Sequence, residues 1–165
     1  MKTWLVIPVV GAVVALTASA LAPSGGSRGG TVIRLYENSA AIHFTPVDVP
    51  PKARQGSVSA GDMFMITGSV FDASARTRKA GELFGQVTAV RAAKDFFHGT
   101  YFVHSFYRLA KGSIVVEGVF SEGKTATAGT FAVTGGTGAY AGVRGTFESK
   151  EQPNGNEVDT IRLLN

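Results

Sequence analysis

The sequence predicts an all-β protein with eight short antiparallel strands, and three observations carry this prediction. Short runs of alternating apolar and polar residues follow one another along the chain. Turn-forming residues separate these runs at hairpin spacing. No stretch has a convincing helical period. Strands of this kind form a closed barrel or a sandwich, and closure removes exposed strand edges.

The N-terminus has the three parts of a secretory signal peptide. Lys2 gives a positive start, Leu5 to Leu16 form an apolar run, and Ala20 to Ala22 form a small-x-small cleavage site. Residues 1–22 are therefore predicted to be a signal peptide, with an uncleaved N-terminal anchor as the alternative. The apolar run is too short for a stable membrane span. We expect a secreted or extracytoplasmic protein.

After cleavage, residues 23–30 form a glycine- and serine-rich flexible tether, and residues 31–165 form one domain. The chain has no cysteine, so its core must hold without disulfides. Its 16 basic and 12 acidic residues give a net charge of +4. These charges are spread along the chain, so we expect no nucleic-acid partner.

The first strand is expected over Thr31–Glu37 and ends at the polar turn Asn38-Ser39. His43–Pro51 is expected to be an extended loop, because prolines at 46, 50 and 51 disfavour a helix or a central strand. The remaining strands are expected at Met63–Asp72, Glu82–Arg91, Phe96–Arg108, Ser113–Phe120, Phe131–Thr134, Val143–Ser149 and Glu157–Leu163. Turn signals lie between them at Lys111-Gly112, Glu122-Gly123, the glycine-rich run 135–142 and Pro153–Gly155.

Two glycine motifs superficially match nucleotide-binding fingerprints. Gly136-x-Gly138-x-x-Ala141 resembles a dinucleotide-binding loop, and Gly118 to Thr125, which includes Lys124, matches the P-loop pattern. Both motifs require a helix directly after the glycines. Here each is followed by a strand-like segment, so we reject both and predict hairpin turns.

The run Thr134-Gly-Gly-Thr-Gly-Ala-Tyr-Ala-Gly-Val-Arg-Gly145 resembles the signature turn of the dirigent and allene oxide cyclase-like barrels. The resemblance extends upstream to Gly61-Asp62, Gly81–Gly85 and the segment His104–Gly118, and so covers about residues 61 to 147. It implies a single eight-stranded antiparallel β-barrel, often a homotrimer. It also implies an isomerase- or cyclase-like activity, or stereochemical steering, on a small hydrophobic molecule.

Glu37 is the first candidate catalytic residue. Alternation places it on the face of Ile33 and Leu35, so its carboxyl group could line the barrel interior. Burial would raise its pKa and suit a general acid or base. A solvated acid at the strand end is the alternative. The resemblance favours function, since these families carry an acid near this strand end.

Arg144 is the second candidate catalytic residue. It matches an arginine that dirigent proteins commonly carry in the glycine turn, and the alternative is a clamp on the turn. We expect Glu37 and Arg144 to face the lumen at one rim. Ala139 stands where the dirigent pattern usually has an aspartate, so the acid pair for quinone-methide chemistry is incomplete. Asp62 is expected to cap a turn.

Phe96–Arg108 offers candidate ligand-binding residues on both faces. His104 lies on one face and Tyr101 and Tyr107 on the other, and the period of two does not decide which face lines the lumen. His98 is roughly 20 Å from His104 along a strand, which is too far for one metal ion. We expect no metal and no cofactor. A Ser-His-Asp triad finds no support, because its nucleophile elbow is missing.

Three functions fit these observations. The first is a secreted barrel that binds a small hydrophobic molecule and steers its cyclisation or coupling by confining it. The second is a lipocalin-like carrier without turnover. The third is a structural or interaction module whose barrel is filled by its own phenylalanines, of which the chain has 11.

Overall fold

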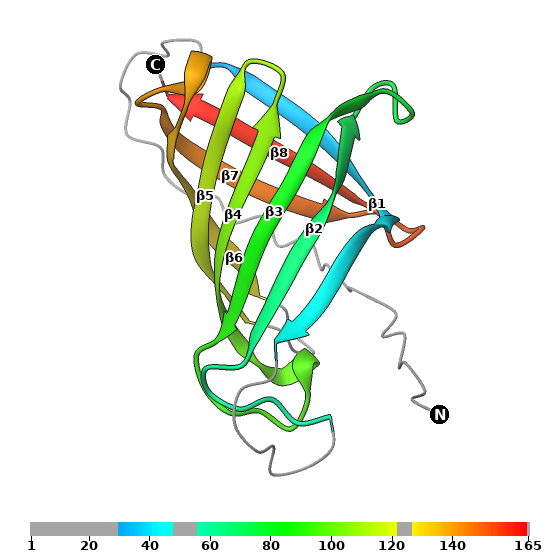
Figure 1. The fold of residues 1–165 in the computed structure, drawn as a ribbon, viewed down its shortest axis with the longest axis vertical. Helices are drawn as coiled ribbons and strands as arrows, with labels where there is room; N and C mark the ends of the chain where they lie inside the picture. Colours follow the sequence, from blue (N-terminus) through cyan, green and yellow to red (C-terminus); the bar gives the residue numbers. More distant parts are fainter. Residues whose placement is uncertain (1–29, 48–55, 122–126, 165) are drawn as a thin grey trace.

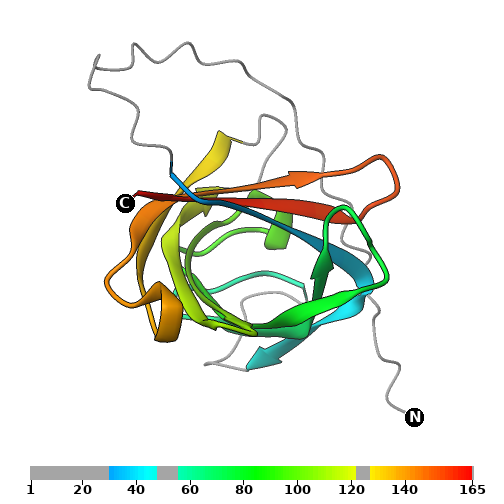
Figure 2. The same ribbon diagram turned by 90° about the horizontal axis from the view of Figure 1, so that it is seen from above.

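The computed structural model describes residues 30–47, 56–121 and 127–164, which form a closed antiparallel barrel of eight strands (Figure 1). Each strand pairs with its neighbour in sequence, and the last strand closes against the first. Seen from above, the strands form a ring (Figure 2). The strands are β1 (Val32–Val47), β2 (Met63–Asp72), β3 (Lys79–Ala89), β4 (Thr100–Leu109), β5 (Gly112–Ser121), β6 (Thr127–Gly136), β7 (Arg144–Glu151) and β8 (Glu157–Leu164). The all-β barrel prediction is confirmed.

Inward-facing apolar side chains form two core clusters inside the ring. One cluster contains buried residues from every strand except β7, among them Leu35, Val70, Ile114 and Ile161. The other gathers around Tyr101 near the start of β4. The alternation seen in the sequence therefore separates the interior of the barrel from its outer surface.

β1 is longer than the sequence indicates, and the expectation of a loop from His43 onward is wrong up to Val47. β1 pairs with β8 over residues 32–37 and with β2 along most of its length. Between Glu37 and Ile42 its register shifts, and the strand bends sharply (Figure 1). Within the described part of the chain, residues 42–47 pair only with β2. Pro46 is tolerated because an edge segment needs no hydrogen bond on its free side.

The start of β4 also differs from the expected strand Phe96–Arg108. Residues Phe96–His98 form a short 3-10 turn, η1, and the strand begins at Thr100. The Tyr101 hydroxyl donates a hydrogen bond to the Phe96 carbonyl oxygen at 2.7 Å, and the two rings stack with centroids 4.7 Å apart. These contacts fold the segment back onto the strand that follows.

The glycine-rich run forms the β6–β7 connection through the short 3-10 turn η2 (Gly138–Tyr140). Gly138 and Gly142 have φ of 60° and 75°, which side chains rarely adopt. Gly145 has another role, because a Cβ atom there would lie 1.9 Å from the Arg162 carbonyl oxygen of β8. Glycine therefore permits both the turn and the close pairing of β7 with β8.

Several sequence predictions lie outside the described residues. The signal peptide, almost all of the tether, and Lys124 of the P-loop match belong to these segments. On either side of Lys124, β5 and β6 pair in antiparallel fashion, so a strand rather than a helix follows that motif. Among the described residues, no helix has the length and apolar character needed to cross a membrane.

Candidate functional site

Glu37 lies on the inner face of β1, as alternation predicts. It is only 8% exposed, and Leu35 on the same face belongs to the core. The bend of β1 begins directly after Glu37. The next residues are held by local and cross-strand contacts, since the side-chain oxygen of Asn156 accepts a hydrogen bond from the Ser39 backbone amide at 3.0 Å. Glu37 is thus fixed where β1 turns away from β8.

Asp159 of β8 and Tyr107 of β4 meet Glu37 inside the barrel. Asp159 is 1% exposed, and the Tyr107 hydroxyl lies 3.0 Å from its Oδ2 atom. The same hydroxyl lies 3.3 Å from Glu37 Oε1. Tyr107 comes from a strand three positions away from β1 in the ring, so its side chain reaches across the lumen. We call Glu37, Asp159 and Tyr107 the interior triad.

Burial raises the pKa of Glu37 well above its usual value. The neighbouring Asp159 adds to this through charge repulsion and a hydrogen bond between the two carboxyl groups, and Glu157 adds further repulsion. Burial also raises the pKa of Asp159, although hydrogen bonds with Glu37, Ser149 and Tyr107 act against it. A proton on Glu37 is therefore favoured, because two adjacent buried carboxylates would repel each other.

The phenol of Tyr107 stays protonated for similar reasons. Its pKa is raised well above 10, first by burial and then by the charges of Asp159 and Glu37. One hydroxyl proton lies between two carboxyl groups, and Asp159 Oδ1 has no hydrogen-bond partner in the structure. The interior triad thus contains one free acceptor atom and an exchangeable proton on Glu37.

The acidic character of the interior continues beyond the triad. Glu157 pairs directly with Glu37 and with Glu151 across the strands, so all three lie on the inner face. Ser149 donates a hydrogen bond to Glu157 Oε2 at 2.6 Å. In the described strands, no lysine, arginine or histidine lies on this inner face, so its charge is negative wherever a carboxyl group ionises.

Aromatic rings line the interior next to the triad. Tyr107 lies 5.8 Å from Phe147, and Phe147 lies 5.4 Å from Phe131, measured between ring centroids. Phe131 and Phe147 are only partly buried although they face inward. Phe44, opposite the inward-facing Ile66 of β2, is 42% exposed. Solvent therefore reaches part of the inner surface. Phe131 and Phe147 lie between this exposed part and the carboxyl groups of the triad.

The partial exposure of these rings accompanies short strand pairing nearby. In the residues that the structure describes, β7 pairs with β6 only over residues 145–147, and β1 leaves β8 after Glu37. Among the described residues, the strand pairing is therefore complete around the triad and shorter beside the second half of β1.

The proposed ligand-binding residues of β4 divide between two faces. Tyr101 and Tyr107 both face the interior and are buried. Tyr101 is packed among Phe64, Phe96 and Phe120, with ring centroids 4.7 to 6.4 Å away. Its hydroxyl is bound to the Phe96 carbonyl oxygen. Tyr101 thus fills one end of the barrel, whereas Tyr107 lies beside the acids.

His104 does not line the lumen. It faces outward on β4, where Nε2 lies 3.4 Å from Glu117 Oε1 and the ring lies 4.7 Å from that of Phe106. Alternation forces this placement, because Val103 and Ser105 on either side of His104 point inward. The expectation of a pocket histidine is therefore wrong.

Arg144 is also outside the barrel and far from Glu37. It begins β7 opposite Leu164, whereas Glu37 is level with Glu151 at the other end of β7. Its Nη1 atom donates hydrogen bonds to the carbonyl oxygens of Thr134 at 2.7 Å and Val143 at 3.0 Å. The expectation that both residues share a rim and face the lumen is wrong, and the clamp alternative describes the contacts observed.

Asp159 is the main site residue that sequence reasoning missed. The alternation that selected Glu37 also places Glu157 and Asp159 on the face of Ile161 and Leu163, so the signal was present. Asp62, by contrast, is where it was expected. Its Oδ2 atom accepts a hydrogen bond from the Ser59 backbone amide at 3.0 Å, which closes the turn before β2.

Histidine, cysteine and acidic side chains of the described residues nowhere form a group of three suited to a metal ion. The 11 phenylalanines do not all fill the barrel. Phe64, Phe96, Phe120, Phe131 and Phe147 pack inside, whereas Phe84, Phe102 and Phe106 are exposed on the outer face. Filling of the lumen by phenylalanine is thus only partial.

Comparison with known proteins agrees with this architecture. The family model described as "Allene oxide cyclase barrel like domain" matches residues 43–163. Among solved structures, one titled "Pyocyanin demethylase" superposes with a TM-score of 0.60 at 18% identity, covering 81% of this chain and 100% of that one. This likeness concerns the fold. No curated protein matches the chain.

Proposed function

Because the chain belongs to the family of allene oxide cyclase barrel-like domains, we propose that it binds a small hydrophobic molecule in its barrel and transfers protons to and from it. The outcome would be a directed cyclisation, isomerisation or coupling. One observation carries this proposal. A buried pair of carboxyl groups, Glu37 and Asp159, meets the hydroxyl of Tyr107 beside partly exposed aromatic side chains of the inner face.

The triad supports proton transfer because its adjacent buried carboxyl groups disfavour a second negative charge and so favour one proton shared by the pair. Neutral Glu37 can donate its proton to an oxygen, nitrogen or carbon of the bound molecule, and ionised Asp159 can remove one from a neighbouring position. Tyr107 can donate a hydrogen bond to a carbonyl oxygen on which negative charge develops. In a barrel, confinement of the substrate in one conformer supplies much of the remaining rate enhancement.

The inner face favours an aromatic substrate that is neutral or cationic. Phe131 and Phe147, which are partly exposed, offer aromatic rings that stack on a flat molecule and attract a cation. The inner carboxyl groups would repel an anion, such as a fatty-acid carboxylate. The name of the similar structure, pyocyanin demethylase, supports a small aromatic substrate here as well.

A lipocalin-like carrier is the second candidate function. It requires the same partly exposed aromatic interior but no proton transfer. The burial of Glu37 beside Asp159 favours the enzyme, because a carrier of hydrophobic molecules gains nothing from two desolvated carboxyl groups. Turnover of a bound molecule separates the two functions.

Pyocyanin is a suitable first probe, with a long-chain fatty acid as the anionic comparison. We expect saturable binding of pyocyanin, measured by absorbance titration, and weaker binding of the fatty acid. Mass spectrometry of the incubated mixture then reports any conversion. Glu37→Gln keeps the size of the side chain and should abolish conversion while binding persists. Glu148→Gln, on the outer face of β7, is the matched control.

Preferential binding of the fatty acid would contradict the proposed substrate class. Unchanged conversion in Glu37→Gln would contradict the role of the triad. Binding without conversion, for pyocyanin and for related flat aromatic molecules, would leave the carrier as the better function.

A further inference from the structure

The outer surface of β7, β8 and the first half of β1 is strongly basic. Its outward side chains include Arg144 and Lys150 from β7, Arg162 from β8 and Arg34 from β1. Glu148 is the only carboxylate among the outward side chains of these described strand segments, and its contact with Arg162 is 3.4 Å long. We call these side chains the basic face. It carries about three uncompensated positive charges.

Two exposed aliphatic side chains lie among the arginines of this face. Val32 is 53% exposed and lies directly opposite Arg162, and Leu164 is 66% exposed and lies directly opposite Arg144. Side chains in such pairs are close neighbours on the outer surface of the sheet. Arginines around exposed aliphatic groups match the boundary of an anionic membrane, where both kinds of group find partners.

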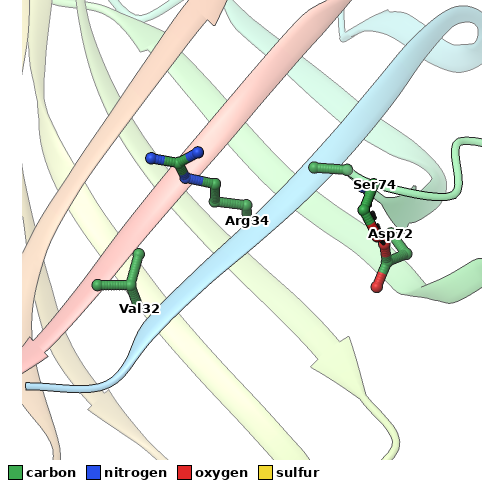
Figure 3. Close-up of a pocket in the computed structure, with 5 residues that line it drawn as sticks. Val32, Arg34, Asp72 and Ser74 are labelled. Atoms are coloured by element: carbon green, nitrogen blue, oxygen red, sulfur yellow. Dashed lines mark hydrogen bonds between the residues drawn. The ribbon is translucent and has the colours of Figure 1, made fainter.

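A shallow groove of about 580 Å³ borders the basic face between β1 and the β2–β3 turn. Figure 3 shows Val32 and Arg34 extending from β1, and Asp72 and Ser74 on the other side of the groove. The charge of Asp72 is already balanced by Arg78 at 2.7 Å. Arg34 has no hydrogen bond or ion pair with its side chain in the described structure. Its guanidinium is therefore available to an external anion.

We propose that the basic face is a docking surface for a membrane of anionic phospholipids. Arg34, Arg144 and Arg162 would contact phosphate groups, and Val32 and Leu164 would reach the apolar boundary below them. The position of the N-terminus supports a membrane rather than another polyanion. The described chain begins at Gly30, where the Thr31 carbonyl accepts a hydrogen bond from Leu163 of this region.

The sequence before Gly30 carries the apolar run Leu5–Leu16. A segment of that composition engages a membrane during export, and until it is cleaved it holds the domain at a membrane by the chain that leads to Val32. During export, the basic face is thus the part of the described barrel that lies nearest in sequence to a segment that engages a membrane. Its charge has the sign that anionic lipid headgroups attract.

Vesicle sedimentation tests the proposal with the full chain. Partition coefficients are measured for vesicles of phosphatidylcholine alone and for an equal mixture with phosphatidylglycerol. We expect stronger binding to the mixed vesicles, and weaker binding as salt is raised from about 50 to 300 mM. Arg34→Gln combined with Arg162→Gln should reduce the preference for anionic vesicles roughly 25-fold, or about five-fold per arginine.

Arg91→Gln combined with Lys94→Gln is the matched control. It removes the same charge near the β3–β4 connection, at the opposite end of the barrel from the β6–β7 turn (Figure 1). This control should bind as the parent does. The N-terminal segment is the same in all variants, so its contribution cancels in the ratio of the two vesicle types.

Three results would overturn the proposal. The first is equal binding to both vesicle types, and the second is an equal loss in the control variant, which would mean that net charge alone acts. The third is binding of heparin or duplex DNA that depends on Arg34 and Arg162 while anionic vesicles are ignored. That outcome would assign the face to a soluble polyanion.

Discussion

Glu37 keeps its proton to a higher pH in the folded protein than in the unfolded chain, because burial and the nearby Asp159 disfavour its charge. The folded state therefore binds more protons than the unfolded state once the pH exceeds the usual glutamate value near 4.5. The stability that this group contributes is fully present below that value. It is lost as the pH rises through the folded pKa of Glu37.

We predict that the protein loses stability as the pH rises above about 4.5 and that Glu37→Gln flattens this loss. Urea unfolding at a series of pH values measures it, and the difference between parent and variant isolates Glu37. Asp72 and Glu82 have lowered pKa values through hydrogen bonds, first with Ser74 and Arg108 respectively. The contributions of Asp72 and Glu82 to stability increase as the pH rises, and they do so below about pH 4.5. Their pH range is therefore separate from that of Glu37. A parent and a variant with parallel pH profiles would disprove the assignment.

We predict that Tyr107→Phe costs about 1–3 kcal/mol of unfolding free energy. The ring is retained, so packing against Phe147 persists, but Glu37 and Asp159 lose the hydroxyl that they share. Chemical denaturation measures the cost. Tyr101→Phe is a useful comparison, since the Tyr101 hydroxyl donates a hydrogen bond to a backbone carbonyl oxygen at the other end of the barrel. If Tyr107 is structural only, conversion of a substrate would survive the substitution.

At the scale of the elements, a side chain stabilises the β6–β7 turn, and a glycine permits the close pairing of β7 with β8. Arg144 closes the turn by binding two carbonyl oxygens. Gly145 lets β8 approach, because no side chain separates it from Arg162. The signature turn thus fixes the position of β7, and β7 and β8 carry Ser149, Glu157 and Asp159 into the interior.

We predict that Gly145→Ala costs about 2–3 kcal/mol or more, because the added methyl group collides with backbone that cannot move freely. Thermal and urea unfolding measure this cost. Gly135→Ala is the control, since an added Cβ atom there meets nothing within 4 Å. Comparable losses in the two variants would contradict the close-approach explanation.

We predict that Arg144→Ala lowers the unfolding free energy by about 1 kcal/mol and leaves ligand binding unchanged. Its contacts are exposed hydrogen bonds to the turn, and it lies outside the barrel. Faster amide hydrogen exchange in residues 134–143 would accompany this change. Loss of substrate binding without loss of stability would contradict this prediction and would support a role for Arg144 in binding the substrate.

At the scale of the whole molecule, the outer surface is divided between two kinds of side chain. The basic face covers β7, β8 and the first half of β1. The outer face of β3, β4 and β5 exposes Phe84, Phe102, Phe106 and Val119. Phe84 is directly opposite Phe106, and Phe102 is directly opposite Val119, so these side chains form two pairs with His104 between them on β4. Such a surface favours burial against another protein.

We propose that this aromatic outer face joins copies of the chain into the homotrimer implied by the family resemblance. Light scattering after size-exclusion chromatography should give three times the monomer mass. Phe106→Glu should give monomers that remain folded by circular dichroism, because Phe106 makes no core contact. Val90→Glu, at a more exposed site outside this patch, is the control. A monomeric parent protein at micromolar concentration would exclude the trimer.

Export is a separate proposal, and it rests on the N-terminal sequence. We expect a mature protein that begins at or near Pro23 and lies outside the cytoplasm. Intact-mass measurement on protein from the native medium or envelope checks this expectation. Retention of Met1 in that material would favour the uncleaved anchor instead.

The sequence by itself determined the strand content and the turns of this protein, because both depend on local spacing. Alternation marked the strands, and glycines at 138 and 142 marked positions where φ is positive. The same alternation placed Glu37 with Leu35. The bend in β1 was missed, since it depends on pairing with two different strands over two parts of its length.

The tertiary structure decided which residues meet. A period of two separates the faces of β4 but does not say which face is inside. Tyr107 and His104 were therefore equal candidates for lining the lumen, and only the closed barrel distinguishes them. Tyr107, Glu37 and Asp159 lie 52 to 122 residues apart in sequence, and only closure of β8 against β1 brings them together. Arg144 lies outside because β7 reaches the level of Glu37 only at Glu151, and register is set by pairing between strands and not by local sequence.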